Sequence, residues 1–137
     1  MKTLLLVDHE PTMHIVAKCK LSGRFDILEA FSVAGALDVF RSHRSIDLLI
    51  CGTELQPVSG MELASLLMVS NFRLRTILMT DLPHDQWTRQ QEKELAELPA
   101  DQVTVLTRPF TLSELKTAIM TLLPEKAERC AQLSGDD

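Results

Sequence analysis

The chain has 137 residues, a length that suits one domain and is too short for two ordinary ones. Its hydrophobic fraction of 45% and charged fraction of 24% are typical of a soluble globular protein, and no apolar run approaches the roughly 20 residues that cross a bilayer. A formal net charge of −5 argues against nucleic-acid binding by this chain alone, because such binding rests on neutralising phosphates.

The first part of the chain predicts two strand–helix units. Residues 3 to 8 form an apolar run that ends on Asp8 and is typical of a strand, and Pro11 fits the first turn of the helix that follows. Residues 26 to 31 alternate in polarity as a shorter strand does, and Ser32 can cap a second helix. The expected apolar stripes are Ile15, Val16 and Cys19 on the first helix, and Ala36, Leu37 and Phe40 on the second.

The stretch from 46 to 60 is expected to hold the central strand. An apolar run at 48 to 51 stops abruptly at Gly52, which is typical of a strand that is buried on both faces and ends in a loop. Ser59 and Glu62 form an S-x-x-E capping box, which predicts the start of a helix. The buried side of that helix is expected to hold Leu63, Leu66, Leu67 and Phe72.

Two further apolar strands are predicted at residues 75 to 80 and 103 to 107. The polar region between them, 81 to 102, predicts a helix that faces water over much of its surface. Thr111 and Glu114 cap a final helix. The expected apolar contacts are Trp87, Leu95 and Leu98 in the polar region, and Leu115, Ile119, Leu122 and Leu123 in the final helix.

Five strands that alternate with five helices through short loops predict a parallel sheet covered on both faces, since each crossover must be right-handed. This α/β domain is expected to span residues 1 to 123, followed at 124 to 137 by a polar tail or helix extension. The carboxyl ends of parallel strands meet at one edge, where ligands bind. Four residues are expected to converge there: Asp8, Gly52, Thr80 and Arg108. An acid, a hydroxyl and a base make that edge a candidate site.

The remaining reactive residue types predict structural roles. His9, Glu10 and His14 do not have the H-E-x-x-H spacing, and Pro11 interrupts them, so no metal site is expected. The cysteines form no CxxC pair, which indicates reduced, mostly structural thiols. The N-terminal apolar run is too short for a signal peptide, so we expect a cytoplasmic protein. The three cysteines are Cys19, Cys51 and Cys130.

A resemblance to a known family is carried by four segments: LLLVDHEP, DLLICGTELQPVSGMEL, TILMTDLP and VTVLTRPF. In this order they resemble the receiver domain of bacterial two-component response regulators. The resemblance implies a flavodoxin-like, CheY-like fold of three α/β/α layers, with the five strands in the order 2-1-3-4-5. It also implies a role in phosphorelay signal transduction.

The resemblance assigns a role to each strand end. In the family, an acidic pair after strand 1 helps bind magnesium, an aspartate ending strand 3 accepts the phosphoryl group, and a strand-4 hydroxyl and a strand-5 lysine contact it. Asp8 matches the first acid and Thr80 the hydroxyl. However, His9 stands at the second acid, Gly52 at the phosphoacceptor and Arg108 at the lysine. An acyl phosphate requires a carboxylate nucleophile, so a glycine excludes phosphotransfer at that position.

These departures imply an atypical receiver, or pseudo-receiver, without a cofactor. Magnesium prefers oxygen ligands, so His9 weakens its site. The planar guanidinium of Arg108 suits carboxylates, which predicts a fixed ion pair. Val105 occupies the position where active receivers keep an aromatic ring, so Thr80 lacks that switch partner. The expected carboxylate partners of Arg108 are Glu54, Asp8 and Asp81.

We therefore expect a non-enzymatic domain that acts by protein–protein interaction. Its partner is expected to be another protein, an attached output domain or a second copy, docked on the face from strand 4 to helix 5, with no nucleic acid and no membrane. Trp87 is the expected anchor there, because tryptophan is enriched among interface anchors. Two alternatives remain open: a phosphorylatable receiver that uses a displaced acid such as Glu54, and a small metal-assisted hydrolase.

Overall fold

The computed structural model describes residues 2 to 43 and 45 to 123. The segment 124 to 137, for which a tail or helix extension is predicted, lies outside the described residues. Within the described ranges, five strands alternate with five α-helices, as predicted. The strands are β1 (Lys2–Val7), β2 (Phe25–Ala30), β3 (Leu48–Gly52), β4 (Arg75–Thr80) and β5 (Val103–Thr107). The helices are α1 (Pro11–Leu21), α2 (Val33–Ser42), α3 (Gly60–Ser70), α4 (Arg89–Ala96) and α5 (Leu112–Leu122), with 3-10 turns η1 (His84–Gln86) and η2 (Ala100–Gln102) on either side of α4.

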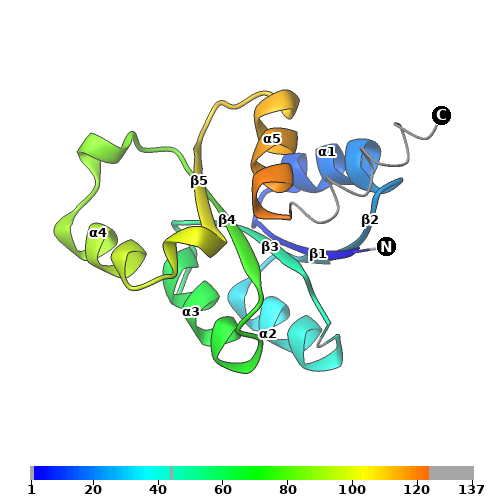
Figure 1. The fold of residues 1–137 in the computed structure, drawn as a ribbon, viewed down its shortest axis with the longest axis horizontal. Coiled ribbons are helices and arrows are strands. Elements are labelled where there is room, and N and C mark those ends of the chain that lie inside the picture. The colour runs from blue at the N-terminus through cyan, green and yellow to red at the C-terminus, as the bar shows by residue number, and fades with distance from the viewer. Residues whose placement is uncertain (1, 44, 124–137) are drawn as a thin grey trace.

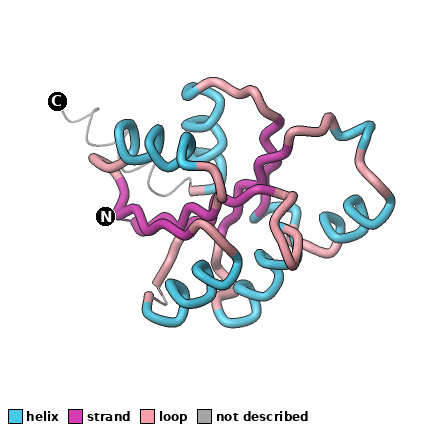
Figure 2. The backbone as a smooth tube through the Cα atoms, turned by 180° about the vertical axis from the view of Figure 1, so that it is seen from behind, coloured by secondary structure: helices cyan, strands magenta, loops and turns pink. Residues whose placement is uncertain are grey.

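The five strands form one parallel sheet in the order β2-β1-β3-β4-β5. Figure 1 shows α1 and α5 on one face of this sheet and α2 and α3 on the other. Helix α4 packs beside α3, at the end of the molecule farthest from the N-terminus, and the view from behind in Figure 2 shows the same arrangement. The predicted flavodoxin-like, three-layer fold class is confirmed.

The sheet separates two layers of apolar core. Along β1, Leu4 and Leu6 pack with α1 and α5, whereas Leu5 and Val7 pack with α2 and α3, because successive side chains of a strand point to opposite faces. β3 is buried on both faces up to Cys51, as its continuous apolar run predicts. The residues that follow β1 and β3 are therefore positioned by strands whose carboxyl ends are buried.

The predicted buried face of α1 is wrong. Ile15, Val16 and Cys19 are exposed, and the buried residues of the helix are His14, Ala17 and Leu21. The spacing of these three is helical, but the face includes a histidine, whose polar ring atoms must find hydrogen-bond partners before it can be buried. Ile15 and Val16 then point to water.

The predicted buried face of α3 is wrong in part. Leu63 and Leu67 are buried as expected, but Leu66 and Phe72 are exposed. Apolar residues occur around most of this helix, so hydrophobic spacing does not single out one face. Met61 and Ala64 complete the buried face, and Leu66 remains on the outside.

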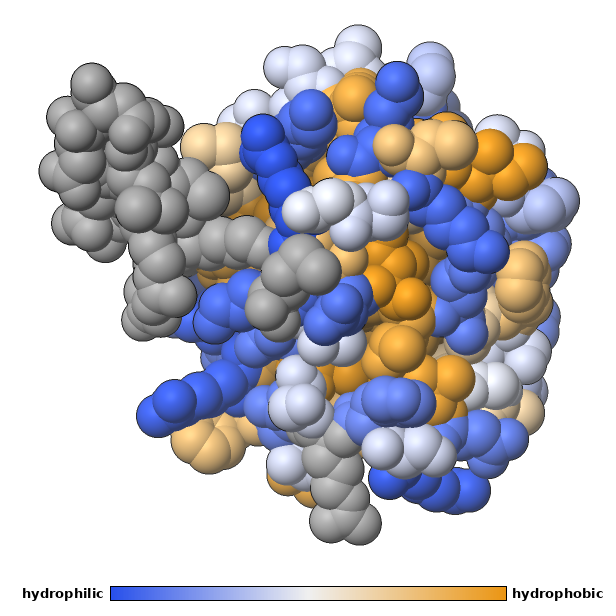
Figure 3. All heavy atoms as spheres, turned by 90° about the vertical axis from the view of Figure 1, so that its right-hand side faces the viewer, coloured by the Kyte–Doolittle hydropathy of each residue, from blue (hydrophilic) through white to orange (hydrophobic). Residues whose placement is uncertain are grey.

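Hydrophobic surface is also visible at the side of the molecule where β2 forms the edge of the sheet. Figure 3 shows a band of hydrophobic residues across the middle of this side, surrounded by polar residues. The β2 strand pairs only with β1, so its outer backbone edge lacks a neighbouring strand within the described residues. Among those residues, no helix combines the length and apolar character that a membrane crossing requires.

Candidate functional site

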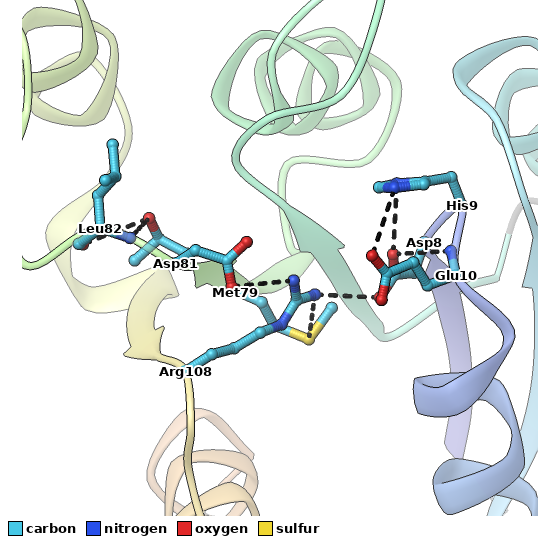
Figure 4. A network of polar contacts seen from close by, with 8 residues as sticks. Asp8, His9, Glu10, Met79, Asp81, Leu82 and Arg108 are labelled. Atoms are coloured by element: carbon cyan, nitrogen blue, oxygen red, sulfur yellow. Dashed lines mark hydrogen bonds and ion pairs between the residues drawn. The ribbon is translucent and has the colours of Figure 1, made fainter.

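An ion pair between Arg108 and Asp8 lies at the carboxyl edge of the sheet. Asp8 directly follows β1 and its side chain is only 5% exposed, whereas Arg108 directly follows β5. The Nη2 of Arg108 donates to Oδ2 of Asp8 at 3.0 Å, and Figure 4 shows the two side chains pointing toward each other from opposite sides of the site. The predicted pairing of Arg108 with Asp8 is confirmed.

The guanidinium of Arg108 has two further contacts. Its Nη1 lies 3.5 Å from Oδ1 of Asp81, whose side chain is 62% exposed, so solvent screens this second ion pair. Its Nη2 lies 3.8 Å from Sδ of Met79. Glu54, the third expected partner, is exposed and has no ion pair within the described part of the chain. Arg108 is thus held mainly by Asp8.

The loop after β1 surrounds the other oxygen of Asp8. The backbone N–H of Glu10 donates to Oδ1 of Asp8 at 3.2 Å, and Nδ1 of His9 lies 3.7 Å from the same oxygen. The His9 ring is largely exposed and also lies 3.7 Å from Oε1 of Glu10. Both carboxylate oxygens of Asp8 therefore have polar contacts already, as Figure 4 shows.

Gly52 ends β3 beside this ion pair and leaves space. A Cβ atom at position 52 would meet its nearest atom, the Met79 carbonyl oxygen, at 3.9 Å, which is an ordinary contact. A hollow of about 70 Å³ lies here, lined by Gly52, Glu54, Asp8 and Arg108 among others. The backbone would accept a side chain at Gly52, although this chain has none.

Gly60 closes the loop after β3 against the sheet. A Cβ atom at position 60 would lie 2.1 Å from the Gly52 carbonyl oxygen, a distance that real atoms do not adopt. The Gly60 N–H donates to the Thr53 carbonyl oxygen at 3.1 Å. The close approach of these backbone segments shapes the floor of the hollow.

Thr80 ends β4 at the same edge, but its hydroxyl serves its own loop. Its Oγ1 accepts from the N–H of Leu82 at 3.1 Å and donates to the carbonyl oxygen of Leu82 at 3.4 Å. Val105, the predicted switch position, is half-buried and packs against the core on the α2 and α3 face. The structure brings Asp8, Asp81 and Arg108 into contact and leaves the Thr80 hydroxyl outside that network.

Trp87 is buried, so its ring offers little surface to a partner. It packs in the core cluster on the α2 and α3 face, and its Nε1 donates to the Leu82 carbonyl oxygen at 3.1 Å. A role as a docking anchor stays a prediction, and it would require the ring to leave this core. Its observed contacts are those of a residue that fixes the loop between β4 and α4.

His14 is buried beneath the Asp8 backbone, and this burial was not predicted, since the sequence predicted a structural role for it without placing it in the core. Its Nε2 lies 2.8 Å from the Asp8 carbonyl oxygen and its Nδ1 lies 2.7 Å from Oε2 of Glu29. A carboxylate and a backbone carbonyl thus lie within hydrogen-bonding distance of the two ring nitrogens, which gives this buried polar ring its partners. The ring also stacks on Phe31, with centroids 4.0 Å apart.

Glu29 is the carboxylate that contacts both His14 and Lys18. Burial raises the pKa of its carboxyl, but hydrogen bonds from Lys18 and His14, together with their charges, outweigh burial and leave the pKa below its usual value. The Lys18 ammonium lies 2.8 Å from Oε1 of Glu29. The sequence feature that could have predicted the burial of His14 is its helical spacing from Ala17 and Leu21, which share the buried face of α1.

Cys51 is adjacent to Gly52 but is not a reactive thiol. Burial, and then the negative charge of Asp8, raise the pKa of Cys51 to about 12. A thiol with that pKa stays protonated near neutral pH and is a poor nucleophile. The structural reading of this cysteine agrees with its complete burial in β3.

The donor set at the site fits a magnesium ion poorly. Among the described residues, no group of three or more His, Cys, Asp or Glu side chains is arranged to hold a metal ion. Asp8 is the buried carboxylate of the site, and its partner at 3.0 Å is the guanidinium of Arg108. A divalent cation at Asp8 would have to displace or repel that fixed positive charge.

No family model and no curated protein matches the chain. Solved structures do match it over nearly its whole length. A CheY-like response regulator receiver domain protein from Methanospirillum hungatei JF-1 superimposes with a TM-score of 0.77 at 17% identity, covering 94% of this chain and 98% of that one. The signal receiver domain of an HD domain-containing protein from Pseudomonas fluorescens Pf-5 gives 0.76 at 20% identity, covering 93% and 98%.

A third match is the response regulator protein TrrA from Thermotoga maritima in complex with Mg²⁺ and beryllium fluoride. It gives a TM-score of 0.66 at 28% identity, covering 89% of this chain and 99% of that one. Each of the three matches spans nearly all of both chains. The chain therefore has the fold of a response regulator receiver domain.

Proposed function

We propose that this chain is an atypical receiver domain that acts in signal transduction by binding other proteins, without being phosphorylated and without catalysing a reaction. The observation that carries the proposal is the ion pair between Arg108 and Asp8 beside Gly52. At the end of the central strand there is no carboxylate nucleophile, and the neighbouring acid is already neutralised. We place the domain in the cytoplasm.

In this proposal, the Arg108 guanidinium supplies the positive charge that pairs with the acids at the carboxyl edge of the sheet. In the Thermotoga protein, magnesium and beryllium fluoride are bound together. Here the Arg108 guanidinium contacts Asp8 and Asp81, so a permanent cation stands near the acids. We infer that the domain uses no cofactor and that its edge stays in one state, because an ion pair built into the chain does not depend on a phosphodonor.

The residues around Thr80 agree with a domain that does not switch. Both hydrogen bonds of its hydroxyl stay within the loop after β4, and Val105 supplies no aromatic ring that could follow a movement of that hydroxyl. The domain would then act as a constant docking module for a partner protein, an attached output domain or a second copy. The Pseudomonas match is itself part of a larger HD domain-containing protein.

Phosphorylation on Glu54 is the alternative that the structure keeps open, since this exposed carboxylate lines the hollow beside Gly52. The test is to incubate the protein with magnesium and acetyl phosphate and to measure its intact mass. We expect no added phosphoryl group. A stable phosphoryl on the wild-type chain that Glu54→Gln abolishes would overturn the proposal.

A matched variant makes the expected negative result informative. Gly52→Asp places a carboxylate where the backbone has room for a side chain, within reach of Asp8 and Arg108. If this variant gains a phosphoryl group and the wild type does not, the missing nucleophile is the cause.

Metal analysis of the purified wild type tests the second alternative, a metal-assisted hydrolase. We do not favour it because the Thr80 hydroxyl is hydrogen-bonded within its own loop and the Cys51 thiol is a poor nucleophile.

A further inference from the structure

A groove between α3 and α4 lies apart from the ion-pair site and has its own chemistry. On α3, four residues at helical spacing share the outward face. They are Glu62, Ser65, Leu66 and Val69. Gln90 and Glu94 of α4, together with Glu97, which caps its end, line the other side at helical spacing. The hollow between the two helices measures about 590 Å³. Figures 1 and 2 show α3 and α4 side by side. We refer to this hollow as the α3–α4 groove.

The groove carries negative charge with no cation to balance it. Glu62, Glu94 and Glu97 line it, and within the described residues none of the three forms an ion pair. The side chains of Glu62 and Glu94 lie within hydrogen-bonding reach of each other. Burial, and then a hydrogen bond and repulsion from Glu62, raise the pKa of Glu94. Two carboxylates that share a site disfavour each other's charge, so the groove is short of a positive partner.

The same groove has an exposed apolar wall. Leu66, which lines the groove, is 52% exposed, and Val58 and the buried Met61 line it as well. Val69, which is 84% exposed, lies one turn beyond Leu66 on the same face of α3 and extends this apolar surface past the groove. Contiguous apolar surface beside charge is typical of a binding surface, whereas single exposed apolar residues are ordinary. A groove between two helices with an apolar wall is a surface in which an amphipathic helix can lay its apolar face.

We propose that the α3–α4 groove binds a cationic amphipathic helix of a partner protein. Lysine or arginine side chains of that helix would pair with the carboxylates of Glu62, Glu94 and Glu97, and its apolar residues would cover Leu66 and Val69. The inference rests on the proposed function in that the domain works by binding a protein. It differs from the docking face between β4 and α5 that the sequence suggests, and it names the chemistry of the partner.

The test uses the whole chain and a synthetic peptide as the probe. The peptide is helical, labelled with fluorescein, and carries leucines on one face and arginines on the other; a second peptide has glutamates in place of the arginines. Binding is measured by fluorescence anisotropy, and the contact surface by shifts in the ¹H–¹⁵N spectrum. We expect saturable binding of the arginine peptide only, with shifts concentrated on α3 and α4.

Two pairs of variants separate the groove from general attraction to an acidic protein. Glu62→Gln with Glu94→Gln removes the facing charges at constant shape and should weaken binding about tenfold or more. Glu92→Gln removes an exposed charge of α4 that does not line the groove and should change binding less than about twofold. Leu66→Ser should weaken binding, whereas Met120→Ser on α5, at 53% exposure, should leave it unchanged.

Several outcomes would overturn the proposal. Equal weakening by Glu92→Gln and by the double variant would mean non-specific attraction. Shifts on the β4 to α5 face would move the docking surface there. Self-association of the wild type in sedimentation that Leu66→Ser abolishes would make the occupant a second copy. None of these results depends on phosphorylation, so they are distinguishable from a failure of the proposed function, which the mass measurement decides.

Discussion

Gly60 lies where the loop after β3 folds back on the sheet, and the contact is too close for any side chain. Replacing it with alanine would put a Cβ atom 2.1 Å from the Gly52 carbonyl oxygen, so the backbone must shift. We expect Gly60→Ala to lower the free energy of unfolding by about 1 to 3 kcal/mol. Urea denaturation measures it. Gly23→Ala is the matched control, because nothing lies within 4 Å of a Cβ there, and an equal loss in both variants would contradict the prediction.

Arg108 and Asp8 form the ion pair whose loss should be costly, because Asp8 is buried. Arg108→Gln leaves a buried carboxylate without its main partner, and we expect the free energy of unfolding to fall by about 1 to 3 kcal/mol. The exposed pair of Arg41 and Asp38, at 3.4 Å, is the matched control, and Arg41→Gln should cost less than about 0.5 kcal/mol. Thermal unfolding of both variants compares them, and equal losses would mean that Arg108 is only a surface charge.

The sequence predicted the contacts of those single residues whose side chains have one clear chemical property. The fork of Arg108 and the acids near it predicted a pair, and the pair forms, but spacing alone left three acids possible. Burial decided among them: Asp8 lies at the end of a buried strand, whereas Glu54 lies on an exposed loop. The burial of His14 was not predicted, because one of its hydrogen-bond partners, Glu29, lies on another strand, 15 residues away in the chain.

The junction between α1 and β2 should make stability depend on pH. The folded pKa of Glu29 lies below the usual 4.5, so above that pH the carboxylate contributes stability in full. As pH falls from 4.5 through the folded pKa, the unfolded chain binds the proton more readily, and this contribution is lost. We expect the melting temperature to fall over that range, and to fall less in Glu29→Gln. A Glu29→Gln variant with the wild-type slope would contradict this.

Turn and cap residues predicted where the helices lie better than the apolar pattern predicted which face of each helix is buried. Ser59, Thr88 and Thr111 each accept a hydrogen bond at a helix N-terminus, and two of these caps were predicted. Helices α1 and α3 carry apolar residues on more than one side, so the sheet, and not the local pattern, chooses which side is buried. The exposed residue Leu66, left over by that choice, is what makes the α3–α4 groove apolar.

For the whole molecule, the alternation of strands and helices predicted a parallel sheet covered on both faces, whereas the strand order was predicted from the resemblance to receiver domains. The sheet has that order. What this regular arrangement does not determine is whether the domain has one state or two. A two-state receiver needs a ligand that binds one state better than the other. Here the central position is Gly52, and Asp8, the buried carboxylate beside it, is already paired with Arg108.

Beryllium fluoride with magnesium therefore should not change this domain. The mixture mimics a phosphoryl group and is bound by the matching Thermotoga protein, but at Gly52 it finds no carboxylate to attach to. We expect the ¹H–¹⁵N spectrum and the melting temperature of the wild type to stay the same when it is added. Gly52→Asp, which the backbone accommodates, should show shifts at the ends of β1, β3 and β5 if the remaining residues still form an anion site. Shifts of the wild type spreading across β4 and α5 would mean that the ion pair opens and that the domain retains two states.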